Sequence, residues 1–163
     1  MATSISETNT EENLLTATFR LGDDGIFGID ATLIQEVIMV GDLTPVRHAP
    51  AFVAGVRNLR GRIVTIIDLG IRLGIGPVVQ GIDTRILIAD WKGEPVGLLV
   101  DEVADAIEVE DGTLEPAPPN LHGVQMQKML GVFHSGQRLA ALLDLAAVLG
   151  PDDQAVPPIS NEA

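Results

Sequence analysis

The alternation of apolar and polar positions along the chain predicts a mainly β protein. Short segments rich in β-branched or apolar residues are separated by turns that contain glycine or proline. We predict strands over residues 14–21, 26–30, 62–68, 84–90, 94–101, 129–134 and 138–144. Hairpin turns are expected at Asp23-Asp24-Gly25, Lys92-Gly93 and Ser135-Gly136, since these residue types tolerate the backbone angles of tight turns. So many short strands favour barrels or a sandwich over a parallel α/β sheet.

Helices are expected to be few and short, over residues 31–37, 68–73 and 144–149. The second and third each begin with an aspartate, Asp68 or Asp144, that follows an apolar strand. An aspartate at this place suits a helix N-cap, because its carboxylate can accept hydrogen bonds from the first free backbone N–H groups. We therefore interpret both aspartates as caps.

An internal repeat divides the chain into two similar halves. The first-copy residues Gly55-Val56, Arg62, Asp68-Leu69 and Leu73-Gly74 recur 76 residues later as Gly131-Val132, Arg138, Asp144-Leu145 and Leu149-Gly150. Upstream, Gly28, Ile38, Val40, Asp42 and Thr44 recur 69 residues later as Gly97, Ile107, Val109, Asp111 and Thr113. The difference between these spacings predicts a seven-residue insertion in the second copy, most simply within residues 116–123.

The repeat suggests a domain organisation of two small β-barrels packed together. We expect a flexible N-terminus over residues 1–13, a single ordered domain over 14–150 and a disordered, proline-rich tail over 151–163. Within the domain, lobe 1 would cover about 14–82 and lobe 2 about 83–150. A lobe of about 65 residues is marginal alone, so the two lobes should share a buried interface.

Composition narrows the class of protein. The 163 residues contain no cysteine, which removes disulfides, thiolate metal sites and a thiol nucleophile. Hydrophobic residues make up 46%, yet no apolar run is long enough for a membrane span, and the polar N-terminus does not resemble a secretory signal. These features suggest a cytoplasmic protein. The net charge of −13 makes nucleic acid and anionic membrane surfaces poor partners.

Charge is distributed unevenly along the chain. Half of the basic residues form one island: Arg47, Arg57, Arg60, Arg62 and Arg72. Residues 90–115 are acidic instead, with Asp90, Glu94, Asp101, Glu102, Asp105, Glu108, Glu110, Asp111 and Glu115. These regions are either ordinary solvated surface or faces for different protein partners, since charge complementarity steers association.

No catalytic, metal or cofactor site is indicated by the residues. His48, His122 and His134 show no ligand spacing, and no HExxH or EF-hand pattern occurs. Nucleotide-binding glycine motifs and the GxSxG elbow are missing too. A small-barrel hydrolase that uses Asp68 and His134 remains an alternative, but it lacks a convergent set of polar groups. We therefore expect no enzyme activity, no metal and no cofactor.

The most distinctive segment is residues 52–69, where an apolar run leads into the turn Asn58-Leu59-Arg60-Gly61 and then into another strand. Gly61 suits a turn position with positive φ. The turn would hold Arg60 on a rigid support. Its guanidinium would either meet a partner's carboxylate or brace neighbouring loops of the same chain.

From Phe19 to Gly150 the chain resembles the CheW family of chemotaxis coupling proteins. The resemblance rests on motifs in a characteristic order: Phe27-Gly28-Ile29-Asp30, Ile34-Gln35-Glu36-Val37, Ala49-Pro50-Ala51-Phe52-Val53-Ala54-Gly55-Val56, Asn58-Leu59-Arg60-Gly61, Ile66-Ile67-Asp68-Leu69, Val96-Gly97-Leu98-Leu99-Val100-Asp101-Glu102-Val103 and Pro116-Ala117-Pro118. It implies two five-stranded SH3-like barrels and a non-enzymatic adaptor. Such an adaptor joins the cytoplasmic tips of chemoreceptors to the regulatory domain of a CheA-type histidine kinase in receptor arrays.

The resemblance also implies which residues contact partners: Ile34, Glu36, Val37, Gly55, Asn58, Arg60 and Gly61. It implies an apolar groove between the lobes for a receptor helix. The chain departs from the family pattern at Thr65, where a proline is common, and at Gly70, where an arginine is common. The related regulatory domain of a kinase, or an adaptor fused to a receiver domain, would need further domains that this sequence does not contain.

Overall fold

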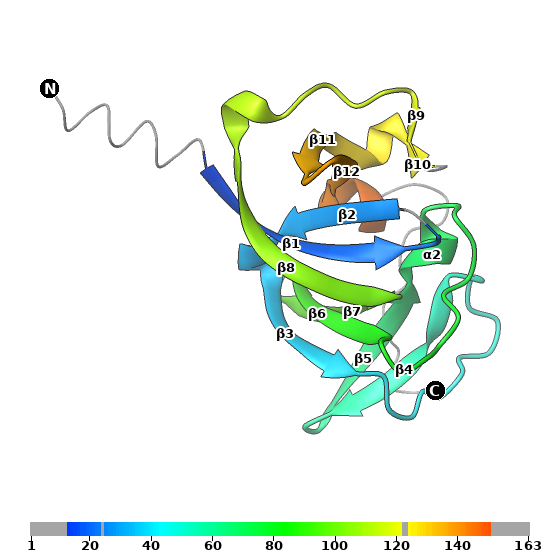
Figure 1. Ribbon diagram of the computed structural model, residues 1–163. Coiled ribbons are helices and arrows are strands. Elements are labelled where there is room, and N and C mark those ends of the chain that lie inside the picture. The colour runs from blue at the N-terminus through cyan, green and yellow to red at the C-terminus, as the bar shows by residue number, and fades with distance from the viewer. Residues whose placement is uncertain (1–12, 24, 122–123, 151–163) are drawn as a thin grey trace, which may run out of the picture.

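The computed structural model describes residues 13–23, 25–121 and 124–150, which form two five-stranded sheets and a few short helices (Figure 1). One sheet, here called the terminal sheet, has the order β11-β12-β2-β1-β8. Its strands are β1 (Asn13–Leu21), β2 (Gly25–Asp30), β8 (Glu102–Glu110), β11 (Met129–Ser135) and β12 (Arg138–Leu143). The mainly β fold expected from the sequence is confirmed.

The other sheet, here called the central sheet, has the order β3-β6-β7-β5-β4. Its strands are β3 (Ile34–Met39), β4 (Val53–Leu59), β5 (Arg62–Asp68), β6 (Arg85–Trp91) and β7 (Glu94–Val100). The remaining elements are the short helices η1 (Ala31–Leu33), α2 (Leu69–Arg72), η2 (Asp111–Thr113), η3 (Met126–Lys128) and α3 (Leu145–Leu149), and the two-stranded pair β9 (Asn120–Leu121) and β10 (Val124–Gln125).

The two sequence copies exchange hairpins, so the sheets do not divide the chain at residues 82 and 83 as the expected lobes would. Hairpin β1–β2 from the first copy pairs with β8 and β12 from the second, and hairpin β6–β7 pairs with β3 and β5 from the first. A sequence repeat shows which strands are equivalent. It does not show whether a strand pairs within its own copy or with the other one.

The strand registers support the duplication. The parallel pair β12–β2 places Leu142 opposite Gly28, and the parallel pair β5–β7 places Ile66 opposite Gly97. These four residues are equivalent at the two spacings found in the sequence. The β9–β10 pair lies between Thr113 and Gly131, the interval in which the sequence predicts the extra residues of the second copy.

Some predictions of individual helices and strands differ from the structure. The helix expected over residues 31–37 is wrong: only Ala31–Leu33 is helical, and Ile34–Met39 is strand β3. The apolar residues of that segment also suit a helix, and pairing with β6 decides for a strand. Strands β4 and β8 were not predicted, because β4 carries two polar residues at its turn end and β8 has acids interspersed among alanine, valine and isoleucine.

Both predicted helix caps are confirmed. The Asp68 carboxylate accepts a hydrogen bond from Ile71 N–H at 3.0 Å at the start of α2. The Asp144 carboxylate accepts one from Ala146 N–H at 3.1 Å at the start of α3. Each satisfies a backbone donor that the helix itself cannot pair.

One hydrophobic core connects the two sheets. Phe19 and Phe27 of the terminal sheet belong to the same buried cluster as Ile66, Ile88 and Leu98 of the central sheet. A smaller cluster beneath the terminal sheet contains Val109, Phe133, Ala140 and Leu142. The shared core explains how two five-stranded units of marginal size can be stable together.

Arg72 links the short helices of the two copies and is 8% exposed. Its Nε donates to the Val148 carbonyl of α3 at 2.6 Å, and its guanidinium carbon lies 4.5 Å from the centre of the Phe52 ring. Residues 72 and 148 occupy equivalent places in the repeat. Arg72 therefore belongs to the core and not to the basic surface predicted from the sequence.

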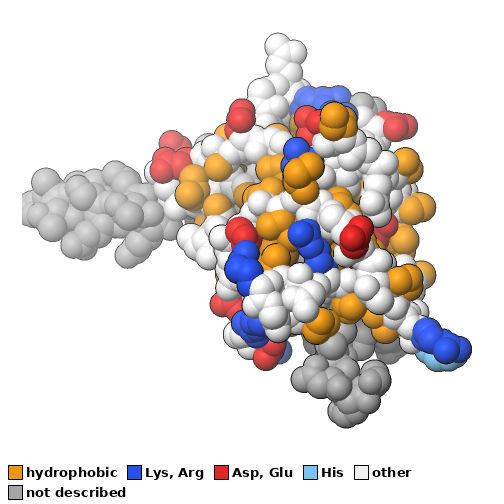
Figure 2. Space-filling model, turned by 90° about the horizontal axis from the view of Figure 1, so that it is seen from below, with side chains coloured by type: hydrophobic (Ala, Val, Ile, Leu, Met, Phe, Trp, Pro, Cys, Tyr) orange, Lys and Arg blue, Asp and Glu red, His pale blue; other side chains and the backbone are white. Residues whose placement is uncertain are grey.

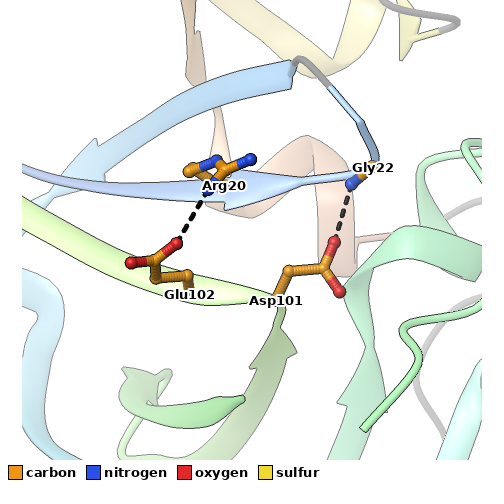
Figure 3. A network of polar contacts seen from close by, with 4 residues as sticks. All are labelled: Arg20, Gly22, Asp101 and Glu102. Atoms are coloured by element: carbon orange, nitrogen blue, oxygen red, sulfur yellow. Dashed lines mark hydrogen bonds and ion pairs between the residues drawn. The ribbon is translucent and has the colours of Figure 1, made fainter. Parts of the chain in front are cut away.

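A polar junction holds the chain where it passes from the central to the terminal sheet (Figure 3). Arg20 of β1 pairs with Glu102 at 2.8 Å, and Asp101 accepts from the Gly22 N–H at 2.7 Å. In Figure 3 both acids point from the β7–β8 corner toward β1. Two of the acidic residues that the sequence grouped as a face therefore act within the fold.

Candidate partner-binding face

The Asn58-Leu59-Arg60-Gly61 segment forms a tight hairpin turn between β4 and β5. Leu59 pairs with Arg62 across the turn, and Arg60 and Gly61 have φ values of 53° and 87°. Two successive residues with positive φ are typical of a type I′ turn, whose twist matches that of the flanking strands. The Asn58 side-chain oxygen accepts from the Gly61 N–H at 2.9 Å and fixes the turn. The predicted positive φ of Gly61 is confirmed.

Arg60 reaches from this turn to the other edge of the central sheet. Its guanidinium forms an ion pair and a hydrogen bond with the Glu36 carboxylate on β3. The side chains are 69% and 32% exposed, so solvent screens the pair. Since β3 and β4 are the two edge strands of the sheet, the ion pair connects its edges. The pair braces the hairpin turn against β3, and the contact of Arg60 with a partner stays a prediction.

Arg57 of β4, which the sequence placed only in the basic island, reaches the same edge. Arg57 Nη1 donates to the Met39 carbonyl and, at 3.1 Å, to the Val40 carbonyl. Gly41, with φ of 63°, leaves room for the guanidinium, because a Cβ there would lie 3.0 Å from Arg57 Cζ. Nothing in the sequence indicates this contact, since it joins residues far apart along the chain.

The remaining predicted contact residues divide between surface and interior. Val37 of β3 is exposed, at 46%, whereas Ile34 at the start of the same strand is partly buried. Gly55 is buried with φ of 150°, and a Cβ there would lie 2.7 Å from the Thr44 carbonyl oxygen. Thr44 and Val56 exchange backbone hydrogen bonds at that point. Gly55 therefore permits a close approach of two backbone segments.

The surface around β3 and the β4–β5 hairpin combines apolar and basic groups. Exposed apolar side chains in this part of the chain are Val37, Met39, Val46 and Ile63, with Met39 at 66%. Figure 2 views the molecule from the side on which β3, β4 and β5 lie in Figure 1, and apolar side chains there are interspersed with both basic and acidic ones. We call these four residues together with Arg57, Arg60 and Arg62 the β3–hairpin face.

This face is rich in arginine, although the chain as a whole is strongly acidic. Its three arginines are opposed by Glu36 and by Glu94, which lies 3.5 Å from Arg62 in an exposed pair. The opposite character is found on β8, where Asp105, Glu108 and Glu110 are exposed. The two edge strands β3 and β8 occupy equivalent places in the repeat but differ in chemistry. Both suit protein partners whose charges are complementary.

The hydrolase alternative finds no support at Asp68. Its carboxylate accepts hydrogen bonds from the N–H groups of Ile71 and Val78, and burial raises its pKa from the ordinary value of 3.8, with Asp101 adding to the rise. His134 is exposed on β11, and His122 lies outside the described residues. Within the described part of the chain, no group of three or more His, Asp or Glu side chains is placed to hold a metal ion.

Comparison with known proteins decides the family, since residues 16–152 match the model of the CheW-like domain. The chain belongs to the CheW-like family. It is 33% identical over 136 residues to the chemotaxis protein CheW of Rhizobium meliloti (strain 1021), a match that covers 83% of this chain and 87% of the relative. It is 34% identical to a probable chemotaxis protein CheW of Rhizobium etli, over 80% and 83% of the two chains.

The solved structure of the scaffolding protein TtCheW from Thermoanaerobacter tengcongensis has the same fold. The TM-score is 0.79 at 27% identity, and the match covers 88% of this chain and 91% of that one. This agrees with the CheW-like fold expected from the sequence. A helix that could cross a membrane was not found in the described ranges.

One departure from the CheW pattern has a structural reason in this chain. At Gly70, where the family resemblance places an arginine, a Cβ would lie 2.1 Å from the Gly76 carbonyl oxygen. The N–H groups of Ile75 and Gly76 donate to the Gly70 carbonyl at 2.8 and 3.1 Å. The segment after α2 folds back on Gly70, so a larger residue would require this segment to move.

Proposed function

We propose that this chain is a non-enzymatic adaptor of bacterial chemotaxis signalling that works in the cytoplasm. It couples the cytoplasmic tips of chemoreceptors to the regulatory domain of a CheA-type histidine kinase within receptor arrays. Membership of the CheW-like family supports this proposal. The observation that carries it is the β3–hairpin face, where Val37 and Arg60 of the expected contact set are exposed, with Glu36 paired to Arg60 and Asn58 fixing the turn that carries Arg60.

The face suits a partner helix that combines apolar and acidic side chains. Val37 and Met39 are two positions apart on β3, so both project from the same side of the strand. They offer apolar contacts of the kind into which one face of an amphipathic helix packs. Arg60, which pairs with Glu36 of the same strand, favours acidic groups on the partner.

Weak individual contacts are sufficient for this function. An interface at or below about 1,200 Å² is typical of transient complexes, and linked copies in an array raise the overall binding strength. Signalling further requires that the adaptor bind the kinase-on and kinase-off arrangements with different affinity. Equal affinity for both would transmit nothing.

Calorimetric titration tests the proposal. The wild-type protein is titrated with the isolated regulatory domain of a cognate CheA-type kinase and, separately, with a helical fragment of a receptor tip. The titrations are repeated with Arg60→Ala and with Arg138→Ala, a control at the start of β12 in the terminal sheet. One-to-one binding of wild type is expected, and Arg60→Ala should weaken one partner about tenfold, or about 1.4 kcal/mol.

Stability separates a binding role of Arg60 from a structural one. The Arg60–Glu36 pair is exposed, so Arg60→Ala should cost at most about 1 kcal/mol of unfolding free energy. Unaltered affinity of this variant for both partners would remove Arg60 from the binding residues. A folded wild-type protein that binds neither partner would disprove the adaptor function and leave the fold as it is.

A further inference from the structure

The structure suggests a role for Arg57 beyond the residues that the family resemblance implies. Arg57 lies on β4, faces the end of β3 and hydrogen-bonds to the carbonyls of Met39 and Val40. Strand β3 pairs on one side only, with β6, and its last pair joins Met39 to Arg85. After this pair the chain continues into Gly41, with positive φ, and the loop to β4. Arg57 thus holds the unpaired side of β3 where the strand ends.

The repeat provides an internal comparison for this contact. Arg57 corresponds to Phe133 and Val40 to Val109 at the two repeat spacings. Phe133 and Val109 are buried in one apolar cluster under the terminal sheet. The same two positions therefore belong to one local cluster in the terminal sheet and are joined by hydrogen bonds in the central sheet. The terminal-sheet residues are part of an apolar cluster, whereas in the central sheet a half-buried arginine donates to two backbone carbonyls.

We propose that Arg57 is a positioning residue for partner binding, an inference that rests on the adaptor function. It fixes the end of β3, the strand that carries Val37 and Met39 and whose Glu36 pairs with Arg60. A strand end that is paired on one side frays at low free-energy cost. A partner can bind only those molecules in which the end of β3 is ordered. The apparent affinity is therefore reduced in proportion to the fraction of molecules that are ordered. Because Arg57 already holds the end of β3 in the free protein, the partner does not have to order it on binding.

Two substitutions separate the hydrogen bonds of Arg57 from its bulk. Arg57→Leu removes the donors and keeps an apolar stem, whereas Arg57→Lys restores a donor that can reach the carbonyls. Arg62→Leu is the matched control for the Met39 signal alone: Arg62 lies on the same hairpin, but it pairs with the side chain of Glu94 on β7 and not with β3. All three are made in the full chain, and the melting temperature of each is recorded.

The readout combines binding with a local spectroscopic signal. The chain has four methionines, so ¹³C-methyl labelling gives few resonances, one of them from the exposed Met39. In Arg57→Leu we expect a shifted and narrowed Met39 signal and about tenfold weaker binding of the partner that uses β3. Arg57→Lys should restore most of both. Arg62→Leu should leave the Met39 signal as in wild type.

Each contrary result has a distinct meaning. Wild-type affinity and an unchanged Met39 signal in Arg57→Leu would overturn the inference and leave the adaptor function standing. Lost affinity with an unchanged Met39 signal and no rescue by lysine would mean that Arg57 contacts the partner directly, which also overturns a positioning role. Wild-type protein that binds neither partner disproves the proposed function. The Met39 signal would then still show whether Arg57 holds β3.

Discussion

The two helix-capping aspartates offer a test of how burial changes the value of the same sequence motif. Asp68 and Asp144 occupy equivalent places in the repeat and cap equivalent helices. Asp68 is 6% exposed and accepts hydrogen bonds from two segments: Ile71 N–H at 3.0 Å and Val78 N–H at 3.1 Å. Asp144 accepts from Ala146 N–H at 3.1 Å, in an exposed setting.

The expected cost of replacing each aspartate by alanine follows from these contacts. Loss of an N-cap costs about 1 kcal/mol of unfolding free energy in either helix. Asp68→Ala also leaves the buried N–H of Val78 without that acceptor, which costs about 1–3 kcal/mol more. Relief of the burial of a carboxylate offsets part of this cost. We expect about 2–3 kcal/mol for Asp68→Ala and about 1 kcal/mol for Asp144→Ala.

Urea unfolding measures the difference. Far-UV circular dichroism and the fluorescence of Trp91, the single tryptophan, follow the transition for wild type and both variants. Coincident transitions and equal slopes would justify a two-state comparison of free energies. The reasoning is refuted if the two variants lose equal stability, because the second anchor at Val78 would then contribute nothing.

Two further predictions concern pH and backbone strain. Burial raises the pKa of Asp68 above its ordinary value of 3.8, so the folded state binds this proton more tightly than the unfolded chain does. The free energy of unfolding of wild type relative to Asp68→Asn should therefore be highest below pH 3.8 and fall as pH rises through the folded pKa of Asp68. Urea unfolding of both proteins from pH 3 to 7 measures this difference, and a difference that stays constant with pH would contradict the prediction. Gly61→Val should cost about 1–3 kcal/mol through strain at positive φ, since a Cβ there meets no atom within 4 Å. Thermal unfolding of Gly61→Val is compared with that of Gly81→Val, a control position where space is equally open and φ is not positive. Equal losses of stability in the two variants would show that the turn tolerates valine.

Local features of the fold could be predicted because they depend on neighbouring residues. Aspartates before short apolar helices, the Lys92-Gly93 hairpin and the positive φ of Gly61 are all confirmed. Segment Ile34–Met39 was misassigned because its pattern suits either a helix or a strand, and only pairing with β6 distinguishes them. The contact role of the seven predicted site residues remains a prediction. The structure shows that Gly55 faces the backbone of Thr44 inside the fold.

The sequence by itself determined the β class, the duplication and the family resemblance, since each rests on residue types and spacings along the chain. Only the tertiary structure decided that the copies exchange hairpins, because equivalent strands can pair within a copy or between copies. It also determined the contacts of three arginines of the basic island. Arg72 is buried against Phe52, Arg60 pairs with Glu36, and Arg57 holds the end of β3. Such contacts depend on which distant segments the fold brings together, and this cannot be predicted from the spacing of residues along the chain.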